Sequence, residues 1–146
     1  MSDRDDITAL VHRYAELLDS GRISDVAALF SRATWRSTRT GTSVVTLTKE
    51  EVWATYDRVI LYADGTPRTH HLISNLTIDL ADGSDDASAS CYFTVLQGVD
   101  TGKPIETILS GRYSDRFRKD DHGWYFVDRV FHADLIGDQS RHFAAR

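Results

Sequence analysis

The chain has 146 residues, a net charge of −5, 41% hydrophobic residues and 27% charged residues. A chain of this length can bury a core as one domain, which we expect to span residues 1–146. No apolar run approaches the roughly 20 residues that a bilayer span needs, and no segment gathers Lys and Arg, so we expect neither a membrane nor a nucleic-acid partner. Because the N-terminus is acidic where a secretory signal is basic and then apolar, we expect a cytoplasmic location.

Residues 3–63 have the pattern of three helices. Apolar residues recur with helical spacing over 7–18, and a glycine stop signal follows, so Asp19 lies at the end of this helix. A short helix is expected over 24–30. A third begins with the capping-box sequence Thr-Lys-Glu-Glu and is expected over 48–60.

Four strands are expected after Pro67, where runs rich in β-branched and aromatic residues are separated by short turns rich in Asp and Gly. Their approximate ranges are 69–80, 87–98, 105–118 and 123–134. Because each turn is short enough for a hairpin, the strands should form an antiparallel meander over residues 69–134, with a tail over 135–146. Helices followed by a meander indicate an α+β fold.

The expected strands carry apolar residues on both faces. Cys91, Phe93 and Val95 alternate onto one face of their strand, and Tyr92 and Leu96 alternate onto the other. A sheet with one face in water would alternate more cleanly. We therefore expect one face to pack on the helices and the other to meet a second subunit in a homo-oligomer.

The histidines and the single cysteine form no metal or nucleophile motif. His70 and His71 are adjacent on one expected strand, so their side chains point to opposite faces and cannot bind the same ion. The sequence has no second cysteine, H-x-x-x-H pair, G-x-S-x-G elbow, phosphate-binding loop or dinucleotide fingerprint. Cys91 is expected to be a small buried hydrophobe. We expect no metal and no cofactor.

His71 is the histidine with the strongest case for a chemical role. It lies early in the first expected strand, next to Leu72 and Ile73, where a buried imidazole needs a polar partner. A carboxylate would be a suitable one. From propensity alone, a structural histidine with a hydrogen bond is the simpler interpretation.

Three long segments carry a family resemblance. They are RYAELLDSGRISDVAALF at 13–30, THHLISNLTIDL at 69–80 and GRYSDRFRKDDHGWYFVDRVFHADLIGDQSRH at 111–142. They resemble the SnoaL-like group of the nuclear-transport-factor-2-like superfamily, and within it the cofactor-free lyases scytalone dehydratase, γ-hexachlorocyclohexane dehydrochlorinase and bile-acid 7α-dehydratase. The resemblance covers most of the chain. It implies a cone-shaped α+β barrel, in which a strongly curved antiparallel sheet wraps around the N-terminal helices and encloses an apolar pocket.

The chemical residues of this group match four positions of the chain. The family's Asp and His dyad falls on Asp19 and His71. Resemblance to bile-acid 7α-dehydratase adds a tyrosine at Tyr14 and an arginine at Arg129. The dehydrochlorinase carries a lysine where this chain has Tyr14, and this difference favours loss of water over loss of halide.

Two of these assignments have structural alternatives. Tyr14 also fits the apolar stripe of the first helix, and Arg129 also fits a cross-strand ion pair with Asp115 or Asp128. Residues five apart on a continuous helix point about 140° apart. Tyr14 and Asp19 can therefore converge only if the helix ends by Asp19.

The family pattern assigns each residue a role in elimination. His71 would remove a proton from carbon, because an imidazole has a pKa near neutrality without much tuning. Asp19 would accept a hydrogen bond from the other ring nitrogen and stabilise the imidazolium. Tyr14 and Arg129 would hydrogen-bond a carbonyl or the departing hydroxyl.

Strand alternation predicts the walls of the pocket. The inward-facing residues are Ile73, Asn75, Leu109, Tyr113 and Phe131. Such an apolar and aromatic pocket suits a hydrophobic cyclic small molecule, of a multi-ring alicyclic, steroid-like or polyketide kind.

The resemblance implies a cofactor-free, dehydratase-like lyase that uses a His–Asp dyad. Within the enzyme class, a polyketide cyclase or a ketosteroid-isomerase-like isomerase is an alternative, because each uses much the same base. Outside it, a ligand-binding or assembly subunit is possible, since the superfamily includes transport factors and small subunits of ring-hydroxylating dioxygenases. The three lyases imply a trimer, with a dimer as the alternative.

Overall fold

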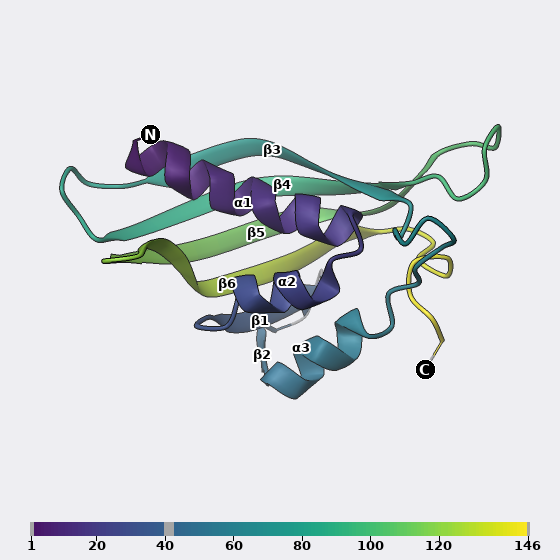
Figure 1. The fold of residues 1–146 in the computed structure, drawn as a ribbon, viewed down its shortest axis with the longest axis horizontal. Helices are drawn as coiled ribbons and strands as arrows, with labels where there is room; N and C mark the ends of the chain where they lie inside the picture. The colour runs from purple at the N-terminus through teal and green to yellow at the C-terminus, as the bar shows by residue number, and fades with distance from the viewer. Residues whose placement is uncertain (1, 40–42, 146) are drawn as a thin grey trace.

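Three helices and six strands make up the part of the chain that the computed structural model describes, residues 2–39 and 43–145 (Figure 1). In chain order they are α1 (Asp3–Asp19), α2 (Ile23–Leu29), β1 (Thr34–Arg39), β2 (Val45–Leu47), α3 (Lys49–Tyr56), β3 (Thr69–Asp79), β4 (Asp86–Gln97), β5 (Glu106–Asp120) and β6 (Gly123–Ile136). None of the described helices combines the length and the apolar character that a bilayer span requires.

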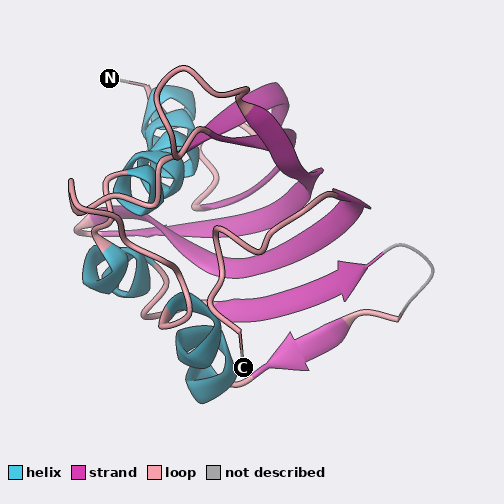
Figure 2. Ribbon diagram, turned by 90° about the vertical axis from the view of Figure 1, so that its right-hand side faces the viewer, coloured by secondary structure: helices cyan, strands magenta, loops and turns pink. Residues whose placement is uncertain are grey.

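The strands form one curved sheet, and the helices lie on one side of it (Figure 2). The strand order is β2-β1-β6-β5-β4-β3. Neighbouring strands are antiparallel except β1 and β6, which are parallel. The sheet is open, with β2 and β3 at its edges, so the cone is not a closed barrel. The predicted α+β class and the antiparallel meander of the last four strands are confirmed.

α1 begins and ends as the sequence predicts. A capping box starts it, because the Ser2 hydroxyl accepts from the Asp5 amide while the Asp5 carboxylate accepts from the Ser2 amide. The helix ends at Asp19, and the next backbone N–H groups fold back onto the last turn in a Schellman motif. This motif needs the positive φ of +75° at Gly21, which glycine adopts without steric cost.

Two strands and one helix end differ from the predictions. β1 and β2 were not expected, because residues 34–47 show no clear alternation of apolar and polar side chains. β1 forms through parallel pairing with the distant β6, which no local pattern reports. α3 was expected to reach Ile60 but ends at Tyr56, and Val59 instead forms an isolated antiparallel bridge with Phe143.

The C-terminal segment folds back beside the end of α3 (Figure 1). The Ile60 amide donates to the His142 carbonyl at 2.8 Å, and the Ala144 amide donates to the Arg58 carbonyl at 2.7 Å. The Gln97 side chain also donates to the Arg141 carbonyl, at 3.0 Å. These bonds hold the segment across one end of the space between helices and sheet.

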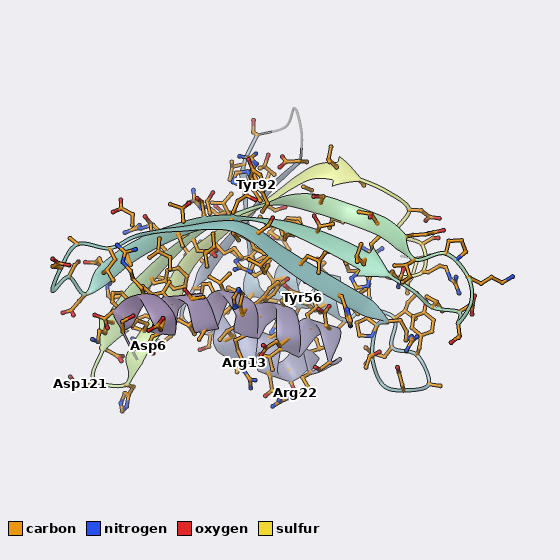
Figure 3. All side chains as sticks on the ribbon, turned by 90° about the horizontal axis from the view of Figure 1, so that it is seen from above. Asp6, Arg13, Arg22, Tyr56, Tyr92 and Asp121 are labelled. Carbon is orange, nitrogen blue, oxygen red and sulfur yellow. The ribbon has the colours of Figure 1, made fainter. Side chains whose placement is uncertain are left out.

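The two faces of β4 have different surroundings. Cys91, Phe93 and Val95 are 3%, 0% and 2% exposed and belong to the core between sheet and helices. Tyr92 is 51% exposed, on the face of the sheet that points away from α1 (Figure 3). The inner face of the sheet therefore carries the core, and this face also bears the candidate site.

Candidate active site

A cavity of about 430 Å³ lies between the helices and the inner face of the sheet. This volume is within the range of small-molecule sites. Its walls include the aromatic residues Tyr14, Trp35, Tyr56, Phe93, Phe131 and Phe143 and the aliphatic residues Leu18, Leu47, Val52, Val59, Val95, Ile108, Leu109 and Ile136. They also include polar groups, at Ser37, Thr55, Arg58, His71, Gln139, Ser140 and His142. The cavity is therefore more polar than the apolar pocket that the sequence predicts.

Asp19 and His71 form a hydrogen-bonded pair at the wall of this cavity. Asp19 Oδ1 lies 2.6 Å from His71 Nδ1, and Asp19 Oδ2 accepts from the His71 backbone amide at 2.7 Å. The Thr69 hydroxyl donates to Asp19 Oδ1 at 2.8 Å. The side chains are nearly buried, with 16% of Asp19 and 5% of His71 exposed. The Asp19 carboxylate at the end of α1 is thus hydrogen-bonded to the start of β3.

The hydrogen bonds to Asp19 fix both its charge and the His71 tautomer. Burial of the Asp19 carboxyl acts to raise its pKa, but the hydrogen bonds and charge of His71 outweigh burial and lower the pKa overall. An ionised carboxylate only accepts hydrogen bonds, so His71 Nδ1 carries a hydrogen and donates it to Asp19. His71 itself lines the cavity, with Nδ1 bound to Asp19.

Tyr14 lines the cavity next to His71. The two rings lie edge to face with centroids 6.2 Å apart, and the Tyr14 hydroxyl is 2.9 Å from that of Tyr56 on α3. Burial raises the Tyr14 pKa, although the charge of Arg129 acts in the opposite direction. Tyr14 therefore keeps its proton and can donate it in a hydrogen bond. Tyr14 and Asp19, both on α1, therefore both lie next to His71.

Arg129 occupies a different position from the one that the family pattern implies. It does not line the cavity, and its side chain is 0% exposed. Its guanidinium donates two hydrogen bonds to the Asp115 carboxylate, at 2.7 and 2.9 Å, across the β5–β6 pair. This is the ion pair that the sequence offered as the alternative. Direct contact between Arg129 and a bound molecule is therefore not supported by its position.

The Arg129 guanidinium packs against the ring of Tyr14, which lines the cavity. Its guanidinium carbon lies 3.8 Å from the centroid of the Tyr113 ring and 4.6 Å from that of Tyr14. Burial acts to lower the Arg129 pKa, but the Asp115 carboxylate outweighs it and raises the pKa, so the cation persists. The positive charge therefore lies beneath a tyrosine of the cavity wall.

The predicted wall residues divide into two groups. Leu109 and Phe131 line the cavity. Ile73 is packed against the core, and Tyr113 is 0% exposed beneath the cavity, so neither is a wall residue. Asn75 is exposed and has a φ of +54°, at a bulge that interrupts the alternation of β3. The prediction of Asn75 in the pocket is wrong because this bulge reverses the strand faces.

Sequence reasoning missed part of the cavity wall. Trp35 lies on an unpredicted strand, and Tyr56 was counted only as part of the third helix. Gln139, His142 and Phe143 come from the C-terminal segment, where no periodic pattern exists. The run of aromatic and histidine residues near the C-terminus was the one available signal. Within the described ranges, no cluster of three or more His, Cys, Asp or Glu side chains could hold a metal ion.

A comparison with protein-family models matches residues 1–130 to the SnoaL-like domain. The chain belongs to the SnoaL-like family. This match spans α1, Asp19, His71 and most of the sheet, and it confirms the resemblance in the sequence. No curated protein matches the sequence significantly.

Solved structures share the fold at low sequence identity. The β subunit of a candidate aromatic-ring-hydroxylating dioxygenase from Novosphingobium aromaticivorans has a TM-score of 0.69 and 17% identity, covering 94% of this chain and 93% of that one. A candidate scytalone dehydratase from the same organism has a TM-score of 0.64 and 21% identity, covering 96% and 87%. A candidate dehydratase of the NTF2-like family from Streptomyces avermitilis has a TM-score of 0.64 and 14% sequence identity. The match covers 92% of this chain and 96% of that one. These likenesses establish an NTF2-like fold.

Proposed function

We propose that this SnoaL-like protein is a cofactor-free lyase that removes water from a hydrophobic cyclic small molecule. The observation that carries the proposal is the bond of 2.6 Å between Asp19 and His71, at the wall of a cavity of about 430 Å³. A pair with one nitrogen held by a carboxylate and the other facing a cavity is arranged to accept a proton. A surface or core histidine needs no such cavity.

In the proposed reaction, His71 Nε2 takes a proton from a carbon beside a carbonyl. The C–H electron pair becomes the new double bond as the hydroxyl on the neighbouring carbon leaves. Asp19 keeps the imidazole oriented and stabilises its positive charge. The Tyr14 hydroxyl, already paired with Tyr56, donates a hydrogen bond to the oxygen on which negative charge develops. The proton held by His71 then completes the departing water.

The structural neighbours support this class of reaction. Two of them are described as candidate dehydratases, and both cover more than nine tenths of this chain. The aromatic walls favour a ring compound, and the polar groups favour one that carries oxygen substituents. A cyclase or isomerase remains an alternative within the enzyme class, because a His71 base would serve either reaction.

A non-catalytic subunit is the second candidate function. The observation in its favour is the likeness to the β subunit of a candidate ring-hydroxylating dioxygenase, which has the highest TM-score of the three structures above. Such a subunit would need no base beside its cavity, and the Asp19–His71 pair therefore favours the enzyme. Co-purification with a larger oxygenase chain would favour the subunit.

We also propose that the protein forms a homo-oligomer. We favour a trimer, with a dimer as the alternative. Leu72 and Tyr92, on neighbouring strands of the sheet, are 49% and 51% exposed. Burial of such side chains against a second copy would be favourable. Light scattering at micromolar concentration checks this, and a monomeric mass would contradict it.

Turnover of a panel of cyclic β-hydroxy ketones tests the lyase proposal. The wild type should form the conjugated enone, and His71→Gln should lose about 100-fold or more in rate. His12→Gln is the matched control, because His12 is exposed on α1 and should leave the rate unchanged. Equal rates in wild type and His71→Gln would refute the assignment. Retained binding without turnover in the wild type would favour the subunit.

A further inference from the structure

The C-terminal segment places a second imidazole in the cavity wall. His142 lines the cavity together with His71 and is only 4% exposed. Its backbone is fixed on both sides, because its amide donates to the Gln139 carbonyl at 3.0 Å and its carbonyl accepts from the Ile60 amide at 2.8 Å. The proposed elimination makes no use of this residue.

The imidazole of His142 is buried without a partner for one of its nitrogens. Nδ1 has no hydrogen-bond partner among the described residues. Buried polar atoms are nearly always paired, since an unpaired one costs free energy of folding. Phe143 next to it, with ring centroids 4.4 Å apart, shows that an aromatic hydrocarbon side chain is accommodated beside this position. The unpaired Nδ1 of His142 therefore indicates a hydrogen-bond partner on a molecule that binds in the cavity.

The charge state of His142 limits what that partner can be. Burial, together with the nearby charge of His71, lowers the His142 pKa to about 4. The ring is therefore neutral near pH 7, and it would not repel a His71 imidazolium formed during a reaction. A neutral imidazole has one N–H and one lone pair, and a hydroxyl can satisfy either. A carbonyl oxygen could satisfy only the tautomer with hydrogen on Nδ1.

We propose that His142 binds a hydroxyl group of the ligand and so selects oxygenated ring compounds over hydrocarbons of the same shape. The torsion about the bond from Cβ to the ring is soft, so the ring can present Nδ1 to the cavity while the backbone stays in place. His142 thus contributes specificity from a segment outside the sheet and helices. This proposal rests on the proposed function only in taking the cavity as the ligand site.

Binding of two matched probes tests this role without requiring turnover. 2-Naphthol and 2-methylnaphthalene have nearly the same shape and differ in the hydroxyl group. The wild type should bind 2-naphthol about tenfold more tightly, as expected for one hydrogen bond. His142→Phe should abolish this preference while it keeps or improves binding of 2-methylnaphthalene. The exposed His12→Phe is the control and should retain the preference.

The outcomes separate this proposal from the lyase proposal. A preference retained in His142→Phe, or no preference in the wild type, would overturn the role of His142. Failure of the wild type to dehydrate any β-hydroxy ketone would leave the probe result intact. If His142→Phe does not fold, ¹⁵N spectra of histidine-labelled wild type replace it. Added 2-naphthol should shift the His142 Nδ1 resonance more than 2-methylnaphthalene does, and equal shifts would contradict the proposal.

Discussion

At the residue scale, the buried charges of this protein fall into two arrangements with different consequences. Asp19 holds His71 at the cavity wall, where one ring nitrogen stays available. Asp115 holds Arg129 in the core, where the pair is closed to the cavity. The sequence identified all four residues, but only coordinates distinguish a pair that faces a cavity from one that does not.

Removal of the Arg129 charge should damage stability. Arg129→Met leaves the Asp115 carboxylate buried and unpaired, so we expect a loss of about 3–5 kcal/mol in the free energy of unfolding. Arg36→Met is a matched control, because Arg36 forms a similar pair with Asp128 but its side chain is 39% exposed. That change should cost about 1 kcal/mol or less. Urea unfolding measures both, and equal losses would show that burial of the pair is unimportant.

At the element scale, local signals predicted the helices and the meander, and they failed where distant segments decide the structure. The capping box of α3 and the end of α1 follow from sequence. β1 depends on pairing with β6, and the C-terminal segment depends on backbone bonds to Arg58 and Ile60. Neither contact produces a periodic pattern of apolar residues in the sequence. No sequence pattern predicts the bulge at Asn75 either, although asparagine is a residue that tolerates the positive φ found there.

The end of α1, which positions Asp19, should be a sensitive point of the fold. Gly21 and Gly83 have nearly the same φ, +75° and +73°. A Cβ on Gly21 would lie 2.0 Å from the Gly65 carbonyl oxygen, whereas a Cβ on Gly83 would meet nothing within 4 Å. Gly83→Ala should therefore cost about 1 kcal/mol, for the left-handed backbone alone. Gly21→Ala should cost more than about 3 kcal/mol, because backbone must also move.

Chemical denaturation of the two alanine variants gives the comparison directly. If Gly21→Ala and Gly83→Ala lost the same free energy of unfolding, the backbone at Gly21 and Gly65 would move apart without cost. The position of Asp19 would then not depend on the contact between Gly21 and Gly65.

At the scale of the whole molecule, the cavity links parts that are distant in sequence. α1 supplies Tyr14, β3 supplies His71, and the C-terminal segment supplies His142. The cavity therefore exists only in the fully folded chain. Sequence resemblance could imply the pocket and the Asp19–His71 pair, but it assigned no role to the polar residues that follow the last strand.

The stability of the molecule should fall on mild acidification, in part because of His142. Its pKa is about 4 in the folded state and 6.5 when unperturbed. Between these values the unfolded chain binds a proton that the folded chain does not, so acid favours unfolding. From about pH 7 to about pH 4.5, His142 should account for a loss of about 2 kcal/mol.

His142→Phe isolates this contribution. The free energy of unfolding of the variant should fall less over the same pH range than that of the wild type. Asp19 has a lowered pKa, so its stabilisation is lost only below its ordinary value of 3.8 and does not interfere. Parallel curves for the two proteins would show that His142 does not titrate in this range.

The central claim is that Asp19 and His71 act as a carbon base inside the cavity, and proton exchange tests it without a leaving group. 2-Tetralone, a bicyclic ketone with acidic C1 hydrogens, is incubated in D₂O and its deuterium uptake is followed by NMR. The wild type should accelerate exchange above the buffer rate, and His71→Gln should remove about 100-fold or more of that acceleration. Exchange by His71→Gln at the wild-type rate, or by the wild type at the buffer rate, would contradict the claim.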